Sequence, residues 1–446
     1  MMVRMKKRLL GCAVAVWMVC AGCSVRAEKV DRSKPMVVVI SLDAFGAESL
    51  RDERLSFPTL RMLMKQGSYA RAMQPVNPTV TWPNHTAIVT GVDSSKSFIM
   101  ANGLITHQQD PTIEPKVLFP STKAELVHVP TVYDIVHQAG MTTAEVDWVA
   151  IHDPKTIDFA FEERPDANSI VVKEMIADGS ITPEQVENFR KPDQTWRDQM
   201  YTNAAVHIIK RHHPNLMLLH YLTLDSMEHR YGFSNPATAA AIAFLDAQVK
   251  QVVDAVKDAG DLDRTTFLIV SDHGQMSVHA RVLPALLLKQ AGFTPEDAGV
   301  LPEAGLAYIY AHHPDAAKLA KLKAAFEGKE GVRSVVTPDG YAAIGIADPK
   351  VNPQAPDMIV FAANGYALTN SDGDITPKKQ TVMTGSHGYL NTEPLMQEIF
   401  IASGRGIKNA GEIPAFKNLN VAPTIAQLLG VQMKNIDGMP VAAALK

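Results

Sequence analysis

Six acids and imidazoles in this sequence share a setting that suits metal-assisted chemistry, because the four segments that carry them follow apolar runs or contain a glycine. They are Asp43, Asp225, His229, Asp272, His273 and His387. Zinc accepts carboxylate and imidazole ligands, and a catalytic zinc site leaves one position open for water or substrate. Six ligands divide into two sets of three, and two metals about 3.5–4 Å apart form the clamp used for in-line displacement at phosphorus. Taken singly, each residue also has an ordinary structural explanation as a cap, turn or loop residue.

A hydroxyl nucleophile is available in the segment 78–91. Pro83 suits the first turn of a helix, which places Thr81 at the helix N-terminus or just before it. Unpaired N–H groups and the helix dipole favour a phosphate at that point. Thr81 is therefore a candidate nucleophile if its hydroxyl pKa is lowered. The alternative is that Thr81 is an N-cap whose oxygen satisfies the start of the helix.

The elements expected from hydrophobic patterning would bring these residues to one edge of a sheet. The segments 35–43, 215–225 and 265–272 are apolar runs that end in an aspartate, as is typical of parallel strands buried on both faces. Ligands gather at the carboxyl ends of such strands. Asp225 and His229, four residues apart, would project from the same face of a helical turn. Helical patterns occur at 58–66, 132–139, 196–211, 236–259 and 422–429.

This alternation of strands and helices predicts an α/β fold with a mostly parallel central sheet flanked by helices. The pattern changes between residues 281 and 380, where strands at 306–310, 332–336 and 358–362 and a helix at 316–326 indicate a small α+β insertion. The predicted core is then formed by 28–280 and 381–446. Residues 92–130 are expected to be irregular, and 150–195 to form a polar surface excursion.

The N-terminus predicts export. Basic residues precede an apolar run that is too short for a membrane span, which indicates a signal peptide within residues 1–27. Ala21-Gly22-Cys23 resembles a bacterial lipobox, and lipidation of Cys23 would anchor the protein to a membrane; cleavage after Ala27 is the alternative. The three cysteines all lie in this segment, so the mature chain has no disulfide and no cysteine nucleophile. We expect a bacterial protein that is periplasmic or a membrane-anchored lipoprotein.

Composition limits the partners. The 446 residues carry a formal net charge of −4, and no basic excess points to a nucleic-acid polymer. A small molecule is the expected substrate, and the sequence leaves the oligomeric state open. The chain has 15 histidines, and seven of those outside the six-residue set are expected to be structural or solvated: His107, His137, His152, His207, His212, His213 and His220. Glu228 is interpreted in the same way.

Taken together, the motifs resemble those of the nucleotide pyrophosphatase/phosphodiesterase family of the alkaline phosphatase superfamily. The similarity covers nearly the whole mature chain. In order, its motifs are Ser41-Leu42-Asp43, Thr81-Trp82-Pro83-Asn84-His85 with Thr90-Gly91, Asp225-x-x-x-His229, Ser271-Asp272-His273-Gly274 and His387-Gly388-Tyr389. Any one of these motifs is weak, and the complete ordered set is specific.

The resemblance implies an alkaline-phosphatase-like fold and hydrolysis of phosphodiester or phosphoanhydride bonds through a covalent phospho-threonine at Thr81. Asn102 would donate a hydrogen bond to a phosphoryl oxygen, while Asn84 would support the helix turn. The implied cofactors are two Zn²⁺, although the ligand types also admit Mn²⁺ or iron. The resemblance places one zinc at Asp43, Thr81, Asp272 and His273, and the other at Asp225, His229 and His387.

The sequence departs from the family pattern near the substrate. His220 and Tyr221 stand, in altered register, where nucleotide-cleaving members often carry an aromatic that stacks on the base, and Trp82 offers one aromatic wall. A nucleotide is therefore one candidate among small phosphodiesters. A phosphomonoesterase or phosphonate hydrolase with the same two-metal site is an alternative. A catalytically inactive surface-binding protein is an alternative from another class, although every expected ligand is present.

Overall fold

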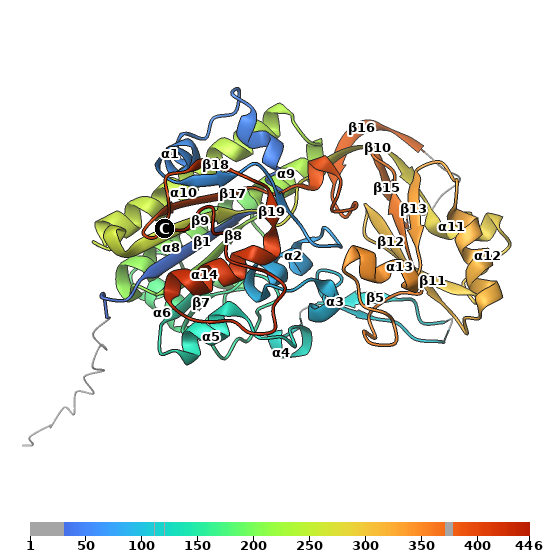
Figure 1. Cartoon of the computed structure of the whole chain (residues 1–446), viewed down its shortest axis with the longest axis horizontal. Helices are drawn as coiled ribbons and strands as arrows, with labels where there is room; N and C mark the ends of the chain where they lie inside the picture. The colour runs from blue at the N-terminus through green and yellow to red at the C-terminus, as the bar shows by residue number, and fades with distance from the viewer. Residues whose placement is uncertain (1–30, 111, 120, 371–377) are drawn as a thin grey trace, which may run out of the picture. The chain divides into compact units, whose positions relative to one another are not determined.

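The computed structural model describes residues 31–110, 112–119, 121–370 and 378–446 (Figure 1). The predicted signal peptide, the lipobox and Cys23 lie outside the described residues. No helix within the described ranges has both the length and the apolar character that a membrane crossing requires.

The central sheet has eight strands in the order β18-β2-β17-β9-β1-β8-β6-β7. The strands β7, β6, β8, β1 and β9 are parallel, and β17 pairs antiparallel with β9. Their bounds are β1 (Met36–Leu42), β2 (Ser68–Ala70), β6 (Thr143–Val146), β7 (Phe159–Phe161), β8 (Leu216–Tyr221), β9 (Thr265–Val270), β17 (Phe400–Gly404) and β18 (Gly411–Ile413). The predicted α/β fold with a mostly parallel sheet is confirmed.

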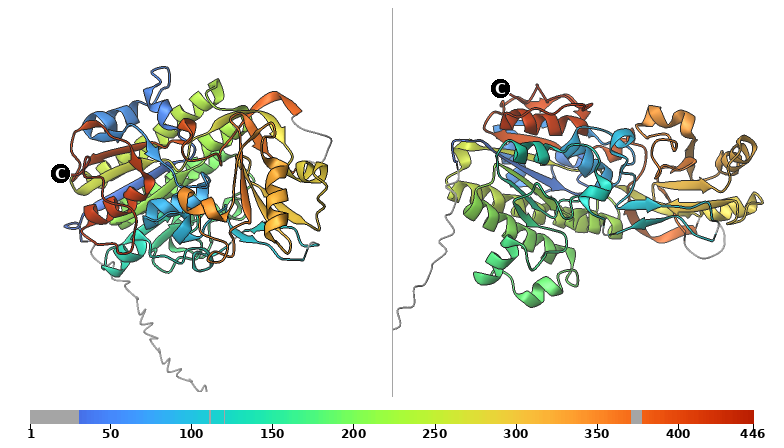
Figure 2. Two further views of the ribbon diagram at one scale, coloured as in Figure 1. Left: turned by 45° about the vertical axis from the view of Figure 1, so that its right-hand side comes forward. Right: turned by 90° about the horizontal axis from the view of Figure 1, so that it is seen from below.

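Strand β1 is apolar except for Ser41 because it packs against helices on both sides. Val38 and Ile40 belong to one core, which also contains residues of α1, α6, α8 and α10. Val37 and Val39 belong to a second core on the opposite face, with residues of α2, α5 and α14. Figure 2 shows the red helix α14 and the green helices on opposite sides of the sheet. The helix bounds are α1 (Pro58–Gln66), α2 (Thr81–Thr90), α5 (Val132–Gln138), α6 (Ile170–Ala177), α8 (Gln194–His212), α9 (Thr223–Tyr231), α10 (Pro236–Asp258) and α14 (Val421–Leu429).

Two smaller sheets lie between β9 and β17 in the chain. One has the order β15-β10-β16, and the other has the order β11-β12-β14-β13. The bounds are β10 (Met276–Val282), α11 (Pro284–Gln290), β11 (Ala298–Pro302), β12 (Leu306–Ala311), α12 (Ala316–Phe326), β13 (Val332–Val336), α13 (Pro338–Tyr341), β14 (Met358–Ala362), β15 (Tyr366–Leu368) and β16 (Lys378–Ser386). They have their own apolar cores, one under α11 and α12 and the other around Tyr308.

The segments expected to be irregular contain short regular elements. The first holds α3 (Ser94–Ser97), β4 (Leu104–Thr106), β5 (Lys116–Leu118) and α4 (Lys123–Leu126), and the second holds α7 (Pro183–Glu187) as well as α6 and β7. The expectation that 150–195 is a polar surface excursion is wrong. Strand β7 is an edge strand of the central sheet, and Phe161, Val172 and Phe189 are buried in its core. Elements of three to five residues are too short for a periodic pattern to reveal.

Candidate active site

The predicted ligands converge at the carboxyl edge of the three central strands. Asp43 follows β1 and Asp272 follows β9, while Asp225 lies in the first turn of α9, which begins directly after β8. Because β8, β1 and β9 are neighbours in the sheet, their ends bring these acids together. Two groups of side chains have ligand atoms within 4.8 Å of one another and could each hold a metal ion. They are Asp43, Asp272 and His273, and Asp225, His273 and His387.

The first group is fully buried. His273 Nε2 lies 3.4 Å from Asp43 Oδ1 and 3.3 Å from Asp272 Oδ2. The same nitrogen lies 3.4 Å from Thr81 Oγ1. The Ala44 N–H donates to the other oxygen of Asp272 at 3.3 Å and fixes that carboxylate. Two carboxylates, one imidazole and the threonine hydroxyl therefore meet around one point.

The second group, with His229 beside it, is more open to solvent. His229 Nε2 lies 3.2 Å from Asp225 Oδ1, as the spacing of four residues on one helix predicts. The His387 ring lies 5.1 Å from the His229 ring and is stacked on His273 with centroids 3.9 Å apart. The His229 side chain is 40% exposed, so this side of the site is the one a substrate can approach. All six predicted acids and imidazoles are thus brought together.

Backbone carbonyls hold the three imidazoles in one orientation. Each ring places Nδ1 next to a carbonyl oxygen: His229 next to Gly385 at 3.0 Å, His387 next to Thr79 at 3.0 Å and His273 next to Gly274 at 3.2 Å. A histidine that donates from Nδ1 leaves the Nε2 lone pair free for a metal, which is the usual arrangement around ligating histidines. With Nδ1 as the donor, each of the three rings would present its Nε2 lone pair to a metal.

Thr81 is the first residue of α2, and its side chain does not cap the helix. The N-cap is Val80, which makes no side-chain cap bond. The explanation of Thr81 as a capping residue is therefore wrong, and its hydroxyl lies against the first ligand group instead. The helix around it is buried, so Thr81 has little freedom to turn away.

The two asparagines of this region differ in role. Asn102 Oδ1 accepts a hydrogen bond from the Trp82 N–H at 3.0 Å, which leaves the Asn102 Nδ2 group to donate. The same bond occupies an N–H that the start of α2 was expected to offer to phosphate. Asn84 is fully buried and bonds to the backbone of Val76 and Pro78, so its predicted role as a support of the turn is confirmed.

The buried carboxylates of the first group have little around them that would neutralise their negative charge. Burial and then the neighbouring acid Asp225 raise the pKa of Asp43, and burial and then Asp43 raise the pKa of Asp272. Asp43 Oδ1 and Asp272 Oδ2 are buried with no hydrogen-bond donor. Ion pairs of these acids within the described residues involve only histidines. Orphaned carboxylate oxygens facing an imidazole lone pair fit a divalent cation.

Around the second group, the neighbouring charges shift the pKa values of the imidazoles. Burial lowers the pKa of His229, but the adjacent carboxylate of Asp225 outweighs it and raises the pKa to about 9. Burial and the charge of His229 lower the pKa of His387 to about 4. His387 is therefore neutral at pH 7, the state in which an imidazole can bind a metal.

Sequence reasoning missed two partners of the ligands. His220, expected to be structural or solvated, is fully buried, and its Nε2 lies 3.0 Å from Asp43 Oδ2. Gln275 donates to Asp225 Oδ1 at 2.9 Å. The available signal for His220 was an imidazole inside the apolar run of β8. Glu228, treated in the same way, is also buried rather than solvated, and only 2% of its surface is exposed.

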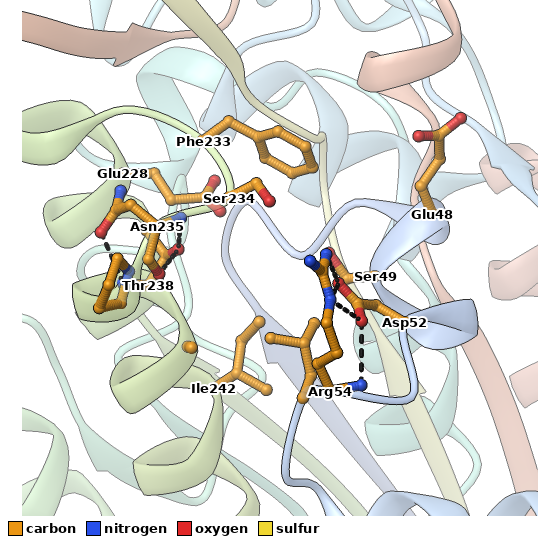
Figure 3. A pocket seen from close by; sticks show the side chains of 13 residues that line it. Glu48, Ser49, Asp52, Arg54, Glu228, Phe233, Ser234, Asn235, Thr238 and Ile242 are labelled. Atoms are coloured by element: carbon orange, nitrogen blue, oxygen red, sulfur yellow. Dashed lines mark hydrogen bonds and ion pairs between the residues drawn. The ribbon is translucent and has the colours of Figure 1, made fainter.

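A cavity of about 460 Å³ lies beside α9 but is not the centre of this chemistry. Glu48, Arg54, Glu228 and Phe233 are among its lining residues (Figure 3). None of the six predicted ligands lines it, and its acid Asp52 is already paired with Arg54 at 2.6 Å.

The central sheet and the strand-end ligands define an alkaline-phosphatase-like α/β protein. The sequence model of the type I phosphodiesterase/nucleotide pyrophosphatase family matches residues 37–390. The chain therefore belongs to this family and is a hydrolase acting on phosphoric ester or anhydride bonds. The family resemblance predicted from the ordered motifs is confirmed.

Similar proteins span most of the chain. Human ectonucleotide pyrophosphatase/phosphodiesterase family member 7 is 24% identical over 420 residues, which cover 91% of this chain and 82% of that protein. A bis(5'-adenosyl)-triphosphatase of Xenopus laevis is 22% identical over 413 residues, which cover 90% and 78%. The structure of human ectonucleotide pyrophosphatase/phosphodiesterase 5 has a TM-score of 0.70 at 19% identity and covers 90% of this chain and 97% of that one.

Proposed function

We propose that the protein hydrolyses phosphodiester or phosphoanhydride bonds of small molecules through a covalent phospho-threonine at Thr81. The observation that carries this proposal is the position of Thr81 Oγ1, which faces the first ligand group at 3.4 Å from His273 Nε2 instead of capping its helix. A helix-start hydroxyl held against two buried carboxylates and an imidazole suits a nucleophile better than a structural residue.

We assign the ligand sets as the sequence predicted them. Asp43, Thr81, Asp272 and His273 would hold one divalent cation, and Asp225, His229 and His387 would hold the other. Bound there, the two cations would lower the pKa of the Thr81 hydroxyl and neutralise charge on the phosphoryl oxygens. Zinc suits this mixture of carboxylates and imidazoles, and Mn²⁺ or iron remains compatible with it.

The chain's own residues then act in two in-line steps. Thr81 Oγ1 forms a bond to phosphorus as the bond to the leaving oxygen breaks, and the hydroxyl proton passes to solvent. Water then attacks phosphorus from the opposite side, the bond to Oγ1 breaks, and free Thr81 returns. The Asn102 amide, oriented by the Trp82 N–H, would donate to a phosphoryl oxygen as charge develops there.

Nucleotides are the substrate class that the relatives support. A murine ectonucleotide pyrophosphatase/phosphodiesterase 5, an inactive threonine-to-alanine variant, was solved in complex with AMP, with a TM-score of 0.66 at 17% identity and coverage of 90% of this chain. In this chain Trp82 contacts Phe119, whose ring is 42% exposed and 5.6 Å from it, so an aromatic surface adjoins the site. With His220 turned inward to Asp43, an aromatic wall at that position is missing.

Export is supported by the N-terminal pattern of basic and apolar residues and by relatives named ectonucleotide enzymes. We propose that the mature protein is periplasmic, either free or anchored through a lipid on Cys23.

The test is a comparison of Thr81→Ala, Thr81→Ser and Thr90→Ala on zinc-loaded protein. Thr90 serves as the matched control because it lies in the same helix, where its hydroxyl donates to the Thr86 carbonyl and accepts from the Val92 N–H. Bis-p-nitrophenyl phosphate, a nucleoside p-nitrophenyl ester, p-nitrophenyl phosphate and a phosphonate are the substrates. We expect Thr81→Ala to lose at least about 10³-fold in kcat while remaining folded. Full activity in Thr81→Ala would exclude the covalent step, and faster hydrolysis of the monoester or phosphonate would favour the alternative reactions.

A further inference from the structure

A second cluster of metal-type side chains lies away from the active site. Glu174 of α6 and His207 and His212 of α8 have ligand atoms within 4.8 Å of one another. Both imidazoles direct Nε2 at the same carboxylate oxygen, Glu174 Oε2, at 3.0 Å for His207 and 2.7 Å for His212. The three side chains are 10–16% exposed, so they are largely withdrawn from water but reachable by an ion.

The surroundings of the cluster fix its members in place. His207 Nδ1 lies 3.2 Å from Asp178 Oδ2, so a carboxylate holds the ring by the nitrogen that faces away from Glu174. Arg211 Nε forms an ion pair with the other oxygen of Glu174 at 2.9 Å, and the ring of Phe159 stacks on His212 with centroids 3.9 Å apart. A carboxylate on the far nitrogen of an imidazole is the partner that ligating histidines usually have.

The cluster is at the opposite edge of the sheet from Thr81. His212 ends α8, and β8 begins at Leu216, whereas Asp225 follows the other end of that strand. Phe159, which touches His212, is likewise the first residue of β7. The cluster is therefore separate from the phosphoryl site. It joins α6, which lies between β7 and α8 in the chain, to the end of α8.

We propose that Glu174, His207 and His212 form a third metal site, of the zinc type, which ties α6 to α8. The ligand set is two imidazoles and one monodentate carboxylate, and water would complete the coordination. Ligand atoms 2.0–2.1 Å from zinc in a tetrahedron stand about 3.3 Å apart, so each imidazole nitrogen needs to move away from Glu174 Oε2 by only about half an ångström. The alternative is that the same side chains form a metal-free ion-pair cluster.

Metal counting separates these two possibilities. The purified full chain is stripped with a chelator, reloaded with excess Zn²⁺, desalted and measured by inductively coupled plasma mass spectrometry. The double variant His207→Gln/His212→Gln should bind one zinc per chain fewer than the wild type, whatever number the phosphoryl site holds. Hydrolysis of bis-p-nitrophenyl phosphate should be unchanged. The matched control is His137→Gln, which removes an imidazole facing the single carboxylate of Asp158 and should leave the count unchanged.

Glu174→Gln provides a second variant if the double substitution impairs folding. It keeps the size and hydrogen-bonding capacity of the side chain but removes its charge, so it should also lose one zinc per chain. It should also lose the part of the zinc-dependent rise in Tm that the third ion supplies. Equal zinc counts in the wild type and in a folded variant would overturn the proposal and leave an ion-pair cluster.

Discussion

His220 contacts a proposed metal ligand without being one itself. Its Nε2 faces Asp43 Oδ2 at 3.0 Å and its Nδ1 faces the Asp147 carbonyl at 3.0 Å. Outer partners of this kind typically contribute 10–100-fold to metal affinity. We therefore expect His220→Phe to weaken zinc binding by 10–100-fold, as measured by competition with a chromophoric chelator, and excess zinc to restore the activity.

The neighbouring residue provides the control for this experiment. Tyr221 points to the other face of β8, where its hydroxyl bonds to Thr202 Oγ1 at 2.7 Å. Tyr221→Phe should therefore keep the zinc affinity of the wild type. If His220→Phe also kept it, the contact with Asp43 would have no role in metal binding.

The proposed metal ligands could be predicted from the sequence, whereas the residues that contact these ligands could not. The acids at the strand ends and the spacing of Asp225 and His229 are features of the local sequence. Once these strands lie side by side in the sheet, the six side chains come together. The contact between His220 and Asp43 depends on the register of β1 against β8, which pairs Ser41 with His220. A shift of one residue would turn the ring to the other face, and no sequence pattern fixes that register.

Glycine matters at the end of β9 because of packing. The Gly274 backbone has no positive φ, so its conformation does not itself require glycine. A Cβ at Gly274 would instead stand 2.0 Å from the Leu395 carbonyl oxygen, closer than any real contact. The loop that contains η4 (Pro394–Met396) therefore packs directly on the backbone that carries Asp272 and His273.

We expect Gly274→Ala to separate these segments, lower Tm and weaken zinc binding, because His273 belongs to both ligand groups. The free energy of unfolding should fall by about 1–3 kcal/mol, the usual cost of overpacking. Gly46→Ala is the control, since its Cβ would lie 3.8 Å from the same Leu395 oxygen. A Gly274→Ala protein as stable as Gly46→Ala would show that the loop is free to move.

The turn between β11 and β12 contains a buried carboxyl group whose ionisation destabilises the folded state. Burial raises the pKa of Glu303 to about 7 from an ordinary 4.5. Because the folded state disfavours the charged form, stability is highest below pH 4.5 and falls as the pH rises through 7. The loss is up to about 3 kcal/mol, given 1.36 kcal/mol per pKa unit.

Glu303→Gln removes this titration and should therefore be more stable than the wild type at pH 8 but not at pH 4.5. Urea unfolding of both proteins at the two pH values measures the difference. Glu327→Gln is the control, because the Glu327 side chain is 56% exposed. Parallel pH dependences of the wild type and Glu303→Gln would mean that Glu303 titrates normally.

The elements divide by length into those the sequence predicts and those it does not. The long patterns agree closely with the structure, as with α1 at 58–66 and α12 at 316–326. Strand β7 has three residues and was missed, although it extends the central sheet. Its place is fixed by pairing with β6, a contact between segments that local patterning does not report.

At the scale of the whole molecule, the fold concentrates acids at one edge of the sheet. Asp43 and Asp272 are fully buried, and their orphaned oxygens repel one another when no cation is present. Metal binding at this edge should therefore stabilise the folded chain, by about 4 kcal/mol per site at a free metal concentration 1,000-fold above Kd. Removal of the metals with a chelator should lower Tm, and zinc should restore both Tm and activity.

The double variant Asp43→Asn/Asp272→Asn separates metal binding from other effects of zinc on the chain. In chelator it should be more stable than the wild type, because two buried charges that lack a cation are replaced by neutral amides. With zinc the order should reverse, since the amides bind the ion poorly and the wild type gains the binding free energy. The measurement is Tm for both proteins with chelator and with zinc, and the expected result is that the order of the two Tm values reverses. If zinc raised the Tm of the variant as much as that of the wild type, the stabilising ion would be bound elsewhere, and the repulsion between Asp43 and Asp272 would not be what metal binding relieves.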